Sequence, residues 1–405
     1  MVNAIRGCMW QLGFLIHEVA FGLFSVFLPL YIISIGGSLI SMGVMASTAL
    51  LLNIPASFFW GYICDRTKHY RRYVLISFLS CSIILYLFTL TSSIHTIIVL
   101  YVVMAVLHVA HEPSKNILIA ELYSRGEWGK SYAFYEGLTE IGWLIGLLHG
   151  VLLSIVGFSA GAILTLCSLL NFSAFLLSLI LVKDPILVFE RMFVRIERIA
   201  GFTYRGVAIA SGATSGFTGG NLMGGSIYSF CGGLILFSLA TSTLFTPLPI
   251  FLSRDLGLPG SMVFTVYALN SSGAIIGYFL VGSKAGQQEE DETLVKAVLF
   301  RSILIFTLWS LTVMNICTVA SASLILALMG FAYALYHVHV LSTSMEVIPQ
   351  GEAGLLNVFM GLGEAVGAYL GPFIAQIYGF TYLFFITATI FLLAHILFRF
   401  SPSIS

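Results

Sequence analysis

Hydrophobic positions along the chain gather into long continuous runs, and short polar or glycine-rich segments separate these runs. The runs cover approximately residues 9–34, 40–60, 73–91, 96–120, 129–153, 159–182, 229–252, 261–282, 294–315, 319–344, 354–377 and 381–399. A run of ~20 apolar residues is long enough to cross the core of a bilayer as an α-helix. A membrane β-barrel would instead alternate polar and apolar residues over strands of ~10 residues. The pattern therefore predicts an all-α membrane protein with twelve transmembrane helices.

The composition narrows the class of protein. Of the 405 residues, 59% are hydrophobic and 9% are charged, whereas a soluble domain carries ~25% charged residues. This excludes a soluble enzyme, a nucleic-acid-binding protein and a disordered chain. The six cysteines are scattered without a C-x-x-C pair, so we predict neither a disulfide framework nor a zinc site. The glycine-rich segment 211–226 lacks the G-K-[ST] of a phosphate-binding loop, and we expect no nucleotide and no cofactor.

The basic residues predict the orientation in the membrane. Of the 18 Lys and Arg residues, all except Lys115, Arg254 and Arg301 fall in the termini and loops of one side. Loops rich in Lys and Arg stay in the cytoplasm. We therefore expect a multi-pass protein of the plasma membrane with both termini cytoplasmic.

The longest break between apolar runs predicts the domain organisation. Residues 1–183 and 229–405 form two bundles of six helices each, and residues 184–228 form a cytoplasmic linker. Within the linker, Arg191, Arg195 and Arg198 recur at helical spacing. This spacing is typical of a short amphipathic helix on the membrane surface, and a solvated linker helix is an equal alternative.

An internal repeat relates the two bundles. Residues 121–134 match residues 346–359, residues 137–140 match 361–364, and residues 27–32 match 245–250. The matches follow the same order and lie at equivalent spans. Two six-helix halves related by an axis along the membrane normal are typical of transporters, whose site lies at the midplane between the halves.

The loop after the second span carries a recognisable motif. Residues 61–72 read GYICDRTKHYRR, which resembles motif A, G-x-x-x-D-R-x-G-R-R, of the major facilitator superfamily. Lys68 stands in place of the motif's glycine, and the basic pair comes two residues late. The resemblance implies a transporter rather than an enzyme, with a small-molecule substrate, protons and membrane lipid as partners, no nucleic acid, and a monomeric state.

The resemblance also implies a conformational latch. In the family the acid of motif A interacts with the cytoplasmic start of the eleventh span and holds one state of the rocking cycle. Carried over to this chain, the predicted latch residues are Gly61, Asp65, Arg66, Arg72, Glu121, Glu346 and Glu352. The alternative is that the basic residues of this loop only set the topology.

Ionisable residues inside the spans predict the functional site, because such groups are costly in lipid and usually functional. Counted at ~1.5 Å per residue from the span ends, several of them reach the same depth, ~15 Å, or half of a ~30 Å core. The predicted substrate and proton-coupling residues are His17, Glu18, His108, His111, Glu112, Lys115, Glu136, Glu140, Tyr333, His337 and Glu364. The alternative is a set of scattered, neutral hydrogen-bonded pairs.

The fourth and fifth spans carry the densest part of this set. His108, His111, Glu112 and Lys115 are spaced i, i+3, i+4 and i+7, which places them on one stripe of a helix. The spacing is not that of the H-E-x-x-H zinc motif and Lys115 repels cations, so we predict no metal site.

The polar residues of the fourth span can be compared with those of the fifth by their depth in the membrane. Glu112 and Glu136 are equally far from the turn near residue 124, so they should lie level, with Lys115 close by. We predict that Glu112, Glu136 or Glu140 carries a transported proton, and that Glu140 and Glu364 face each other across the site.

These observations favour a proton-coupled secondary transporter of a small organic solute. Export of amphipathic or cationic compounds in exchange for protons is slightly favoured by five midplane acids against Lys115 and by the series Gly142, Gly146 and Gly150, which resembles a motif of drug–proton exporters. Proton-driven uptake of a sugar, metabolite or peptide is the alternative. A transporter-like receptor or a lipid scramblase is an alternative of another class.

Overall fold

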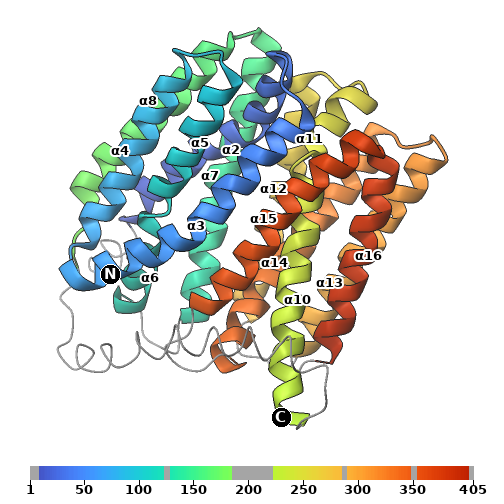
Figure 1. The fold of residues 1–405 in the computed structure, drawn as a ribbon. Helices are drawn as coiled ribbons and strands as arrows, with labels where there is room; N and C mark the ends of the chain where they lie inside the picture. The colour runs from blue at the N-terminus through green and yellow to red at the C-terminus, as the bar shows by residue number, and fades with distance from the viewer. Residues whose placement is uncertain (1–8, 123–127, 185–221, 285–289, 348–353, 401–405) are drawn as a thin grey trace.

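The computed structural model describes residues 9–122, 128–184, 222–284, 290–347 and 354–400, with only the backbone for some residues at the helix ends. All regular structure in these ranges is helical (Figure 1). The helices of the first half are α2 (Gln11–Ser34), α3 (Leu39–Thr67), α4 (Tyr70–Phe88), α5 (Ile94–His108), α6 (His111–Leu122), α7 (Trp128–Val156) and α8 (Ala160–Leu181). Those of the second half are α10 (Leu222–Phe245), α11 (Leu248–Ile250), the π-helix η3 (Phe251–Asp255), α12 (Gly260–Lys284), α13 (Glu290–Val313), α14 (Val319–Val347), α15 (Gly354–Ile377) and α16 (Phe380–Arg399).

The predicted transmembrane spans are confirmed. Within the described ranges, 12 helical segments are long and apolar enough to cross a membrane, and each overlaps one predicted run. Local signals fix several of their ends. Ser38 caps α3 by accepting a hydrogen bond from the backbone of Ser41, and Ser159 caps α8 in the same way through Ala162.

The same helix pairings occur in both halves. In the first half α2 packs against α7 and α8, and α4 packs against α8; in the second half α10 packs against α15 and α16, and α13 packs against α16. Even single hydrogen bonds correspond. Ser82 Oγ donates to Ser168 O over 2.9 Å, and Ser302 Oγ donates to Ala388 O over 2.9 Å at the equivalent place in the second half. The packing agrees with the internal repeat, while the linker boundaries stay a prediction because residues 185–221 lie outside the described ranges.

The two halves stand side by side, blue to green and yellow to red in Figure 1. Helix α7 of the first half packs along α12 of the second, and α3 packs along α15. At one end of these contacts Gly43 lies against Pro372 and Gly150 lies against the ring of Phe264. These two helix pairs therefore form the boundary between the halves.

Glycines bring helices into backbone contact within each half. A Cβ atom at Gly142 or Gly146 of α7 would collide with the carbonyls of Leu15 and Val19 on α2. In the second half, Gly363, Gly367 and Gly371 place α15 equally close to α10. Small residues at such spacing allow close helix packing in membranes, so packing accounts for the glycine series in α7.

The fourth span differs from the prediction, because it is divided into α5 and α6 by a turn at Val109–Ala110. The cause is Pro113, which lacks an N–H and whose ring collides with the carbonyl four residues earlier in a continuous helix. The backbone N–H of Glu112 consequently bonds to Val109 O, only three residues back, over 3.1 Å. The single stripe expected from residue 108 to residue 115 is thus interrupted.

Candidate functional site

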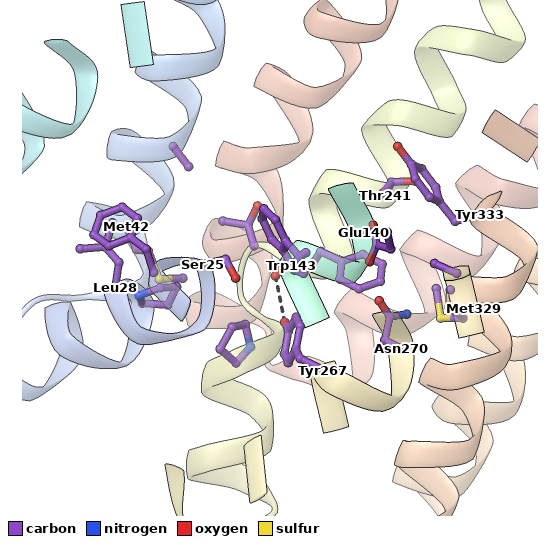
Figure 2. Close-up of a pocket in the computed structure, with 18 of the residues that line it drawn as sticks. Ser25, Leu28, Met42, Glu140, Trp143, Thr241, Tyr267, Asn270, Met329 and Tyr333 are labelled. Atoms are coloured by element: carbon purple, nitrogen blue, oxygen red, sulfur yellow. Dashed lines mark hydrogen bonds between the residues drawn. The ribbon is translucent and has the colours of Figure 1, made fainter. Parts of the chain in front are cut away.

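A cavity of about 390 Å³ lies between the two halves. Helices α2, α3, α5 and α7 line it from one side, and α10, α12, α13 and α14 from the other. Its wall is mostly aromatic or apolar, with a few polar groups (Figure 2). Glu140 and Trp143 of the first half face the same space as Thr241, Asn270 and Tyr333 of the second. A mostly apolar pocket with a few convergent polar groups is typical of a binding site for a small molecule.

A second, smaller cavity of about 160 Å³ lies within the first half, and four of its eight lining residues are glutamates. We call it the acidic pocket, and its lining residues are Glu18, Glu112, Lys115, Tyr135, Glu136, Thr139, Glu140 and Trp143. The convergence of Glu112, Glu136 and Lys115, which was predicted from their distance to one turn, is present. Glu140 and Trp143 line both cavities, so the acidic pocket adjoins the central cavity.

Glu112 is the centre of an ion-paired group in the acidic pocket. Its Oε2 atom lies 2.6 Å from Lys115 Nζ, and its Oε1 atom lies 3.2 Å from His111 Nε2. Lys115 in turn lies over the ring of Tyr135, 5.4 Å from the ring centroid. One carboxylate of the pocket is therefore compensated by a lysine, while Glu18, Glu136 and Glu140 share the same space.

The break between α5 and α6 positions His111. Because the helix is interrupted, the carbonyl of His108 has no helical partner, and it accepts hydrogen bonds from Ser77 Oγ at 2.8 Å and from His111 Nδ1 at 2.6 Å. This bond directs the other ring nitrogen of His111 toward Glu112. The break at Pro113 thus places the imidazole of His111 between the carbonyl of His108 and the carboxylate of Glu112.

The histidines form a second polar group beside the acidic pocket. Asn171 Nδ2 donates to Cys167 O over 3.0 Å, which assigns Asn171 Oδ1 as the acceptor for His17 Nδ1, 2.6 Å away. His17 Nε2 then accepts from His108 Nε2 over 2.9 Å. His17, His108 and His111 offer ring nitrogens within 4.8 Å of one another. In the described chain these nitrogens already have protein partners, and the absence of a metal site stays a prediction.

Glu140 connects the two halves. It lies on α7, and its Oε1 atom accepts a hydrogen bond from Ser271 Oγ of α12 over 2.6 Å. Because α7 and α12 belong to different halves, a relative movement of the halves would change this contact. Glu140 therefore lines both cavities and forms a hydrogen bond across the boundary between the halves.

The candidate residues of the second half form a smaller group. The ring of His337 stacks on that of Tyr333 with centroids 5.6 Å apart, and His337 Nδ1 lies 3.2 Å from the hydroxyl of Tyr278. Tyr333 lines the central cavity. Glu364 lines neither of the two cavities described above, so its position opposite Glu140 stays a prediction.

Arg301 is a cavity residue that the sequence reasoning left out. It lies on α13, is 1% exposed and lines the central cavity. The signal was available, because a charged residue within a span is a candidate functional residue by the argument applied to the acids. The distribution of basic residues identifies Arg301 only as an exception to the topology pattern. Its neighbours come from distant segments, so the sequence does not show what surrounds it.

Motif A lies at the end of α3. Lys68, which replaces the motif's glycine, is the residue after the helix and has a left-handed backbone with φ of 57°. Arg66 Nη1 lies 3.4 Å from the hydroxyl of Tyr62. Gly61 and Asp65 are half-buried on the last turns of α3, and Arg72 is exposed near the start of α4.

The acidic partners of the predicted latch fall outside the described part of the structure. Glu352 and the side chains of Glu121 and Glu346 lie outside the described residues. The latch therefore stays a prediction. Among the neighbouring basic residues, Arg71 has a described contact, because its backbone N–H donates to Asp184 Oδ1 over 2.8 Å.

Comparisons with known proteins agree with this architecture. The sequence profile of the Major Facilitator Superfamily matches residues 12–357. The crystal structure of the human organic anion transporter MFSD10 (TETRAN) is similar, with a TM-score of 0.68, 15% sequence identity, and coverage of 98% of this chain and 99% of that one. At this identity the similarity shows the fold. No curated protein matches the chain in sequence.

Proposed function

Since this chain belongs to the major facilitator superfamily, a family of membrane transporters and not of enzymes, we propose that it is a proton-coupled secondary transporter. It moves a small organic solute by alternating access between its two six-helix halves. The position of Glu140 carries this proposal. One carboxylate borders the space for a solute and the acidic pocket, and it is hydrogen-bonded across the boundary that moves.

The acidic pocket supplies the groups for proton binding. Lys115 compensates Glu112, which leaves Glu18, Glu136 and Glu140 around the same small space. Carboxylates that line one small cavity cannot all be ionised without a free-energy cost, because like charges repel. We infer that one of them takes up a proton when the cavity opens to one side and releases it when the cavity opens to the other.

Two directions of transport fit this mechanism. Export in exchange for protons is the direction favoured by the number of midplane acids, and proton-driven uptake is its alternative. They differ in whether protons move against the solute or with it. We also propose a location in the plasma membrane, cytoplasmic termini and a monomeric state, on the basis of the basic loops and the family.

Proteoliposomes test the proposal. The purified protein is reconstituted with a pH-sensitive dye in the lumen, a panel of organic anions, cations and neutral solutes is added outside, and solute and proton movements are recorded together. We expect at least one solute to drive proton flux, opposite in direction for export or matched for uptake. Solute movement without proton flux in every case contradicts the coupling. Movement of labelled lipid between leaflets, without any solute flux, would identify a scramblase instead.

A further inference from the structure

Arg301 is a buried cation without a described counter-ion. In the described part of the chain no carboxylate forms an ion pair with it. Its Nε atom is buried and has no hydrogen-bond partner among the described residues. A charge held out of water without a partner is costly, and the described residues leave the charge of Arg301 uncompensated.

The surroundings of Arg301 hold the guanidinium in place without neutralising it. The guanidinium carbon lies 4.9 Å from the ring centroid of Phe237, 5.0 Å from that of Phe391 and 5.4 Å from that of Tyr333. Its Nη1 atom donates to Thr241 Oγ1 over 3.1 Å, while Thr241 Oγ1 donates to the carbonyl of Phe237 over 2.9 Å. The ring faces exclude water and stabilise the cation, and N–H groups of the fork remain for a ligand.

The rest of the cavity indicates the kind of molecule that would approach this cation. Phe24, Trp143 and Met329 provide apolar surface in the same cavity, and Asn270 Nδ2 donates to the carbonyl of Leu326 over 2.6 Å. The volume of about 390 Å³ suits a small organic molecule. An apolar body with one negatively charged oxygen group would match both parts of the cavity.

We propose that Arg301 binds an anionic group of the transported solute, so that the solute class is a small organic anion with an apolar body. The group is a carboxylate, sulfonate or phosphate, whose oxygens accept parallel hydrogen bonds from the N–H groups of a guanidinium. This inference rests on the proposed function, because it takes the central cavity to be the transport route. It also weakens the ground for a cationic solute, which came from counting the midplane acids against Lys115 alone.

Three solutes with the same apolar body test the inference. Naphthalene-2-carboxylate, its neutral amide and the corresponding methylammonium compound are compared for binding to the purified protein in lipid nanodiscs, at equal pH on both sides. We expect the carboxylate to bind at least about tenfold more tightly than the other two, as a charge-assisted hydrogen bond predicts. Equal binding of the three, or binding of none, overturns the inference.

Variants separate binding from support of the fold. Arg301→Gln should abolish the preference for the carboxylate, and Arg301→Lys should retain part of it through the charge alone. Arg254→Gln, in η3 and outside the lining of the central cavity, should leave it unchanged. Gel filtration shows whether each variant is folded. If Arg301→Gln does not fold, the test rests on the three solutes with the wild-type protein and on the weaker carboxylate preference expected for Arg301→Lys. A carboxylate preference that Arg301→Gln leaves intact also overturns the inference.

The failure of this inference and the failure of the proposed function give different results. If the carboxylate binds through Arg301 but no solute drives proton flux, the anion-binding role of Arg301 is supported and the proposed proton coupling is contradicted. If only neutral or cationic solutes drive proton flux, the coupling stands and the role of Arg301 is wrong.

Discussion

At the scale of single residues, Lys68 has a backbone conformation that suits glycine better than lysine. It follows the last turn of α3 with φ of 57°, and its backbone N–H caps the helix by bonding to Cys64 O. A left-handed backbone brings the Cβ atom of an L-residue too close to its own chain, at a cost of about 1 kcal/mol. The family's glycine at this place is explained by the same geometry.

We therefore expect Lys68→Gly to stabilise the protein by about 1 kcal/mol, because the strain disappears while the cap remains. Thermal unfolding of the detergent-solubilised protein measures the change. Lys68→Ala is the matched control, because it removes the side chain and keeps the strained backbone. A glycine variant no more stable than the alanine variant would show that the lysine side chain, not the backbone, determines the stability here.

Replacing individual glutamates of the acidic pocket by glutamine should affect transport differently. Glu140 is our first candidate for the proton carrier, since it alone among Glu112, Glu136 and Glu140 lines the central cavity in the described structure. We expect Glu140→Gln to abolish gradient-driven accumulation and to spare solute exchange at equal pH, because exchange needs binding and rocking but no net proton movement. The two assays are run side by side in proteoliposomes.

Glu112→Gln and Glu136→Gln complete the comparison. Glu112→Gln should also lower stability, because it leaves Lys115 without its ion-pair partner. If all three variants still accumulate solute against a gradient, the proton site lies elsewhere, and Glu18 with His17 becomes the next candidate.

At the scale of elements, the break between α5 and α6 is the feature that arranges the polar groups of the first half. Pro113 frees the carbonyl of His108, and that carbonyl orients His111 toward Glu112. Replacing the proline restores the missing N–H and removes the steric reason for the break. The helix would then continue and turn Glu112 and Lys115 relative to the acidic pocket.

We expect Pro113→Ala to fold, because alanine favours the helix, and to reduce proton-coupled accumulation about tenfold or more by misplacing the carboxylate–lysine pair. Accumulation and equal-pH exchange are measured as for the glutamate variants. Pro55→Ala, in the apolar middle of α3, is the control for the loss of a proline within a span. Equal effects of the two substitutions would argue that the break has no specific role.

The elements were more predictable than the contacts between them. Apolar runs were sufficient to place the spans, since a bilayer core sets their length. The meeting of Glu112, Glu136 and Lys115 followed from helix rise alone, because one short turn joins their two spans. The division at Val109–Ala110 was missed although Pro113 was visible, because the spacing of the polar residues was read as that of one helix.

Contacts between distant spans could not be predicted. The bond between His17 and His108 joins the first and fourth spans, and the rings around Arg301 come from α10, α14 and α16. No local pattern encodes which faces of such helices meet. The sequence could therefore identify charged residues within the membrane, but it could not separate a paired lysine from an unpaired arginine.

At the scale of the whole molecule, the boundary between the halves is formed by α3 with α15 and α7 with α12. Motif A ends α3, so it lies on a helix that packs against the opposite half. This position supports the predicted latch, whose acidic partners on the second half lie outside the described residues.

We expect Asp65→Asn to change the balance between inward-open and outward-open states without abolishing solute binding, because it removes a charge that stabilises one state. Labelling of single cysteines introduced on the two faces measures the balance. Asp184→Asn is the matched control, since Asp184 contacts Arg71 within the first half. Unchanged cysteine accessibility on both faces in Asp65→Asn would count against the latch.

Glu140 and Arg301 line the same cavity with opposite charges, and this has a consequence for the role of the membrane voltage. We expect an anion bound at Arg301 to be attracted less strongly while Glu140 is ionised, which favours the uptake alternative, in which the anion and the proton move together. A monovalent anion and one proton carry no net charge across the membrane. Such transport is electroneutral: the pH difference drives it, and the electrical potential, which drives most cation uptake into cells, leaves it unaffected.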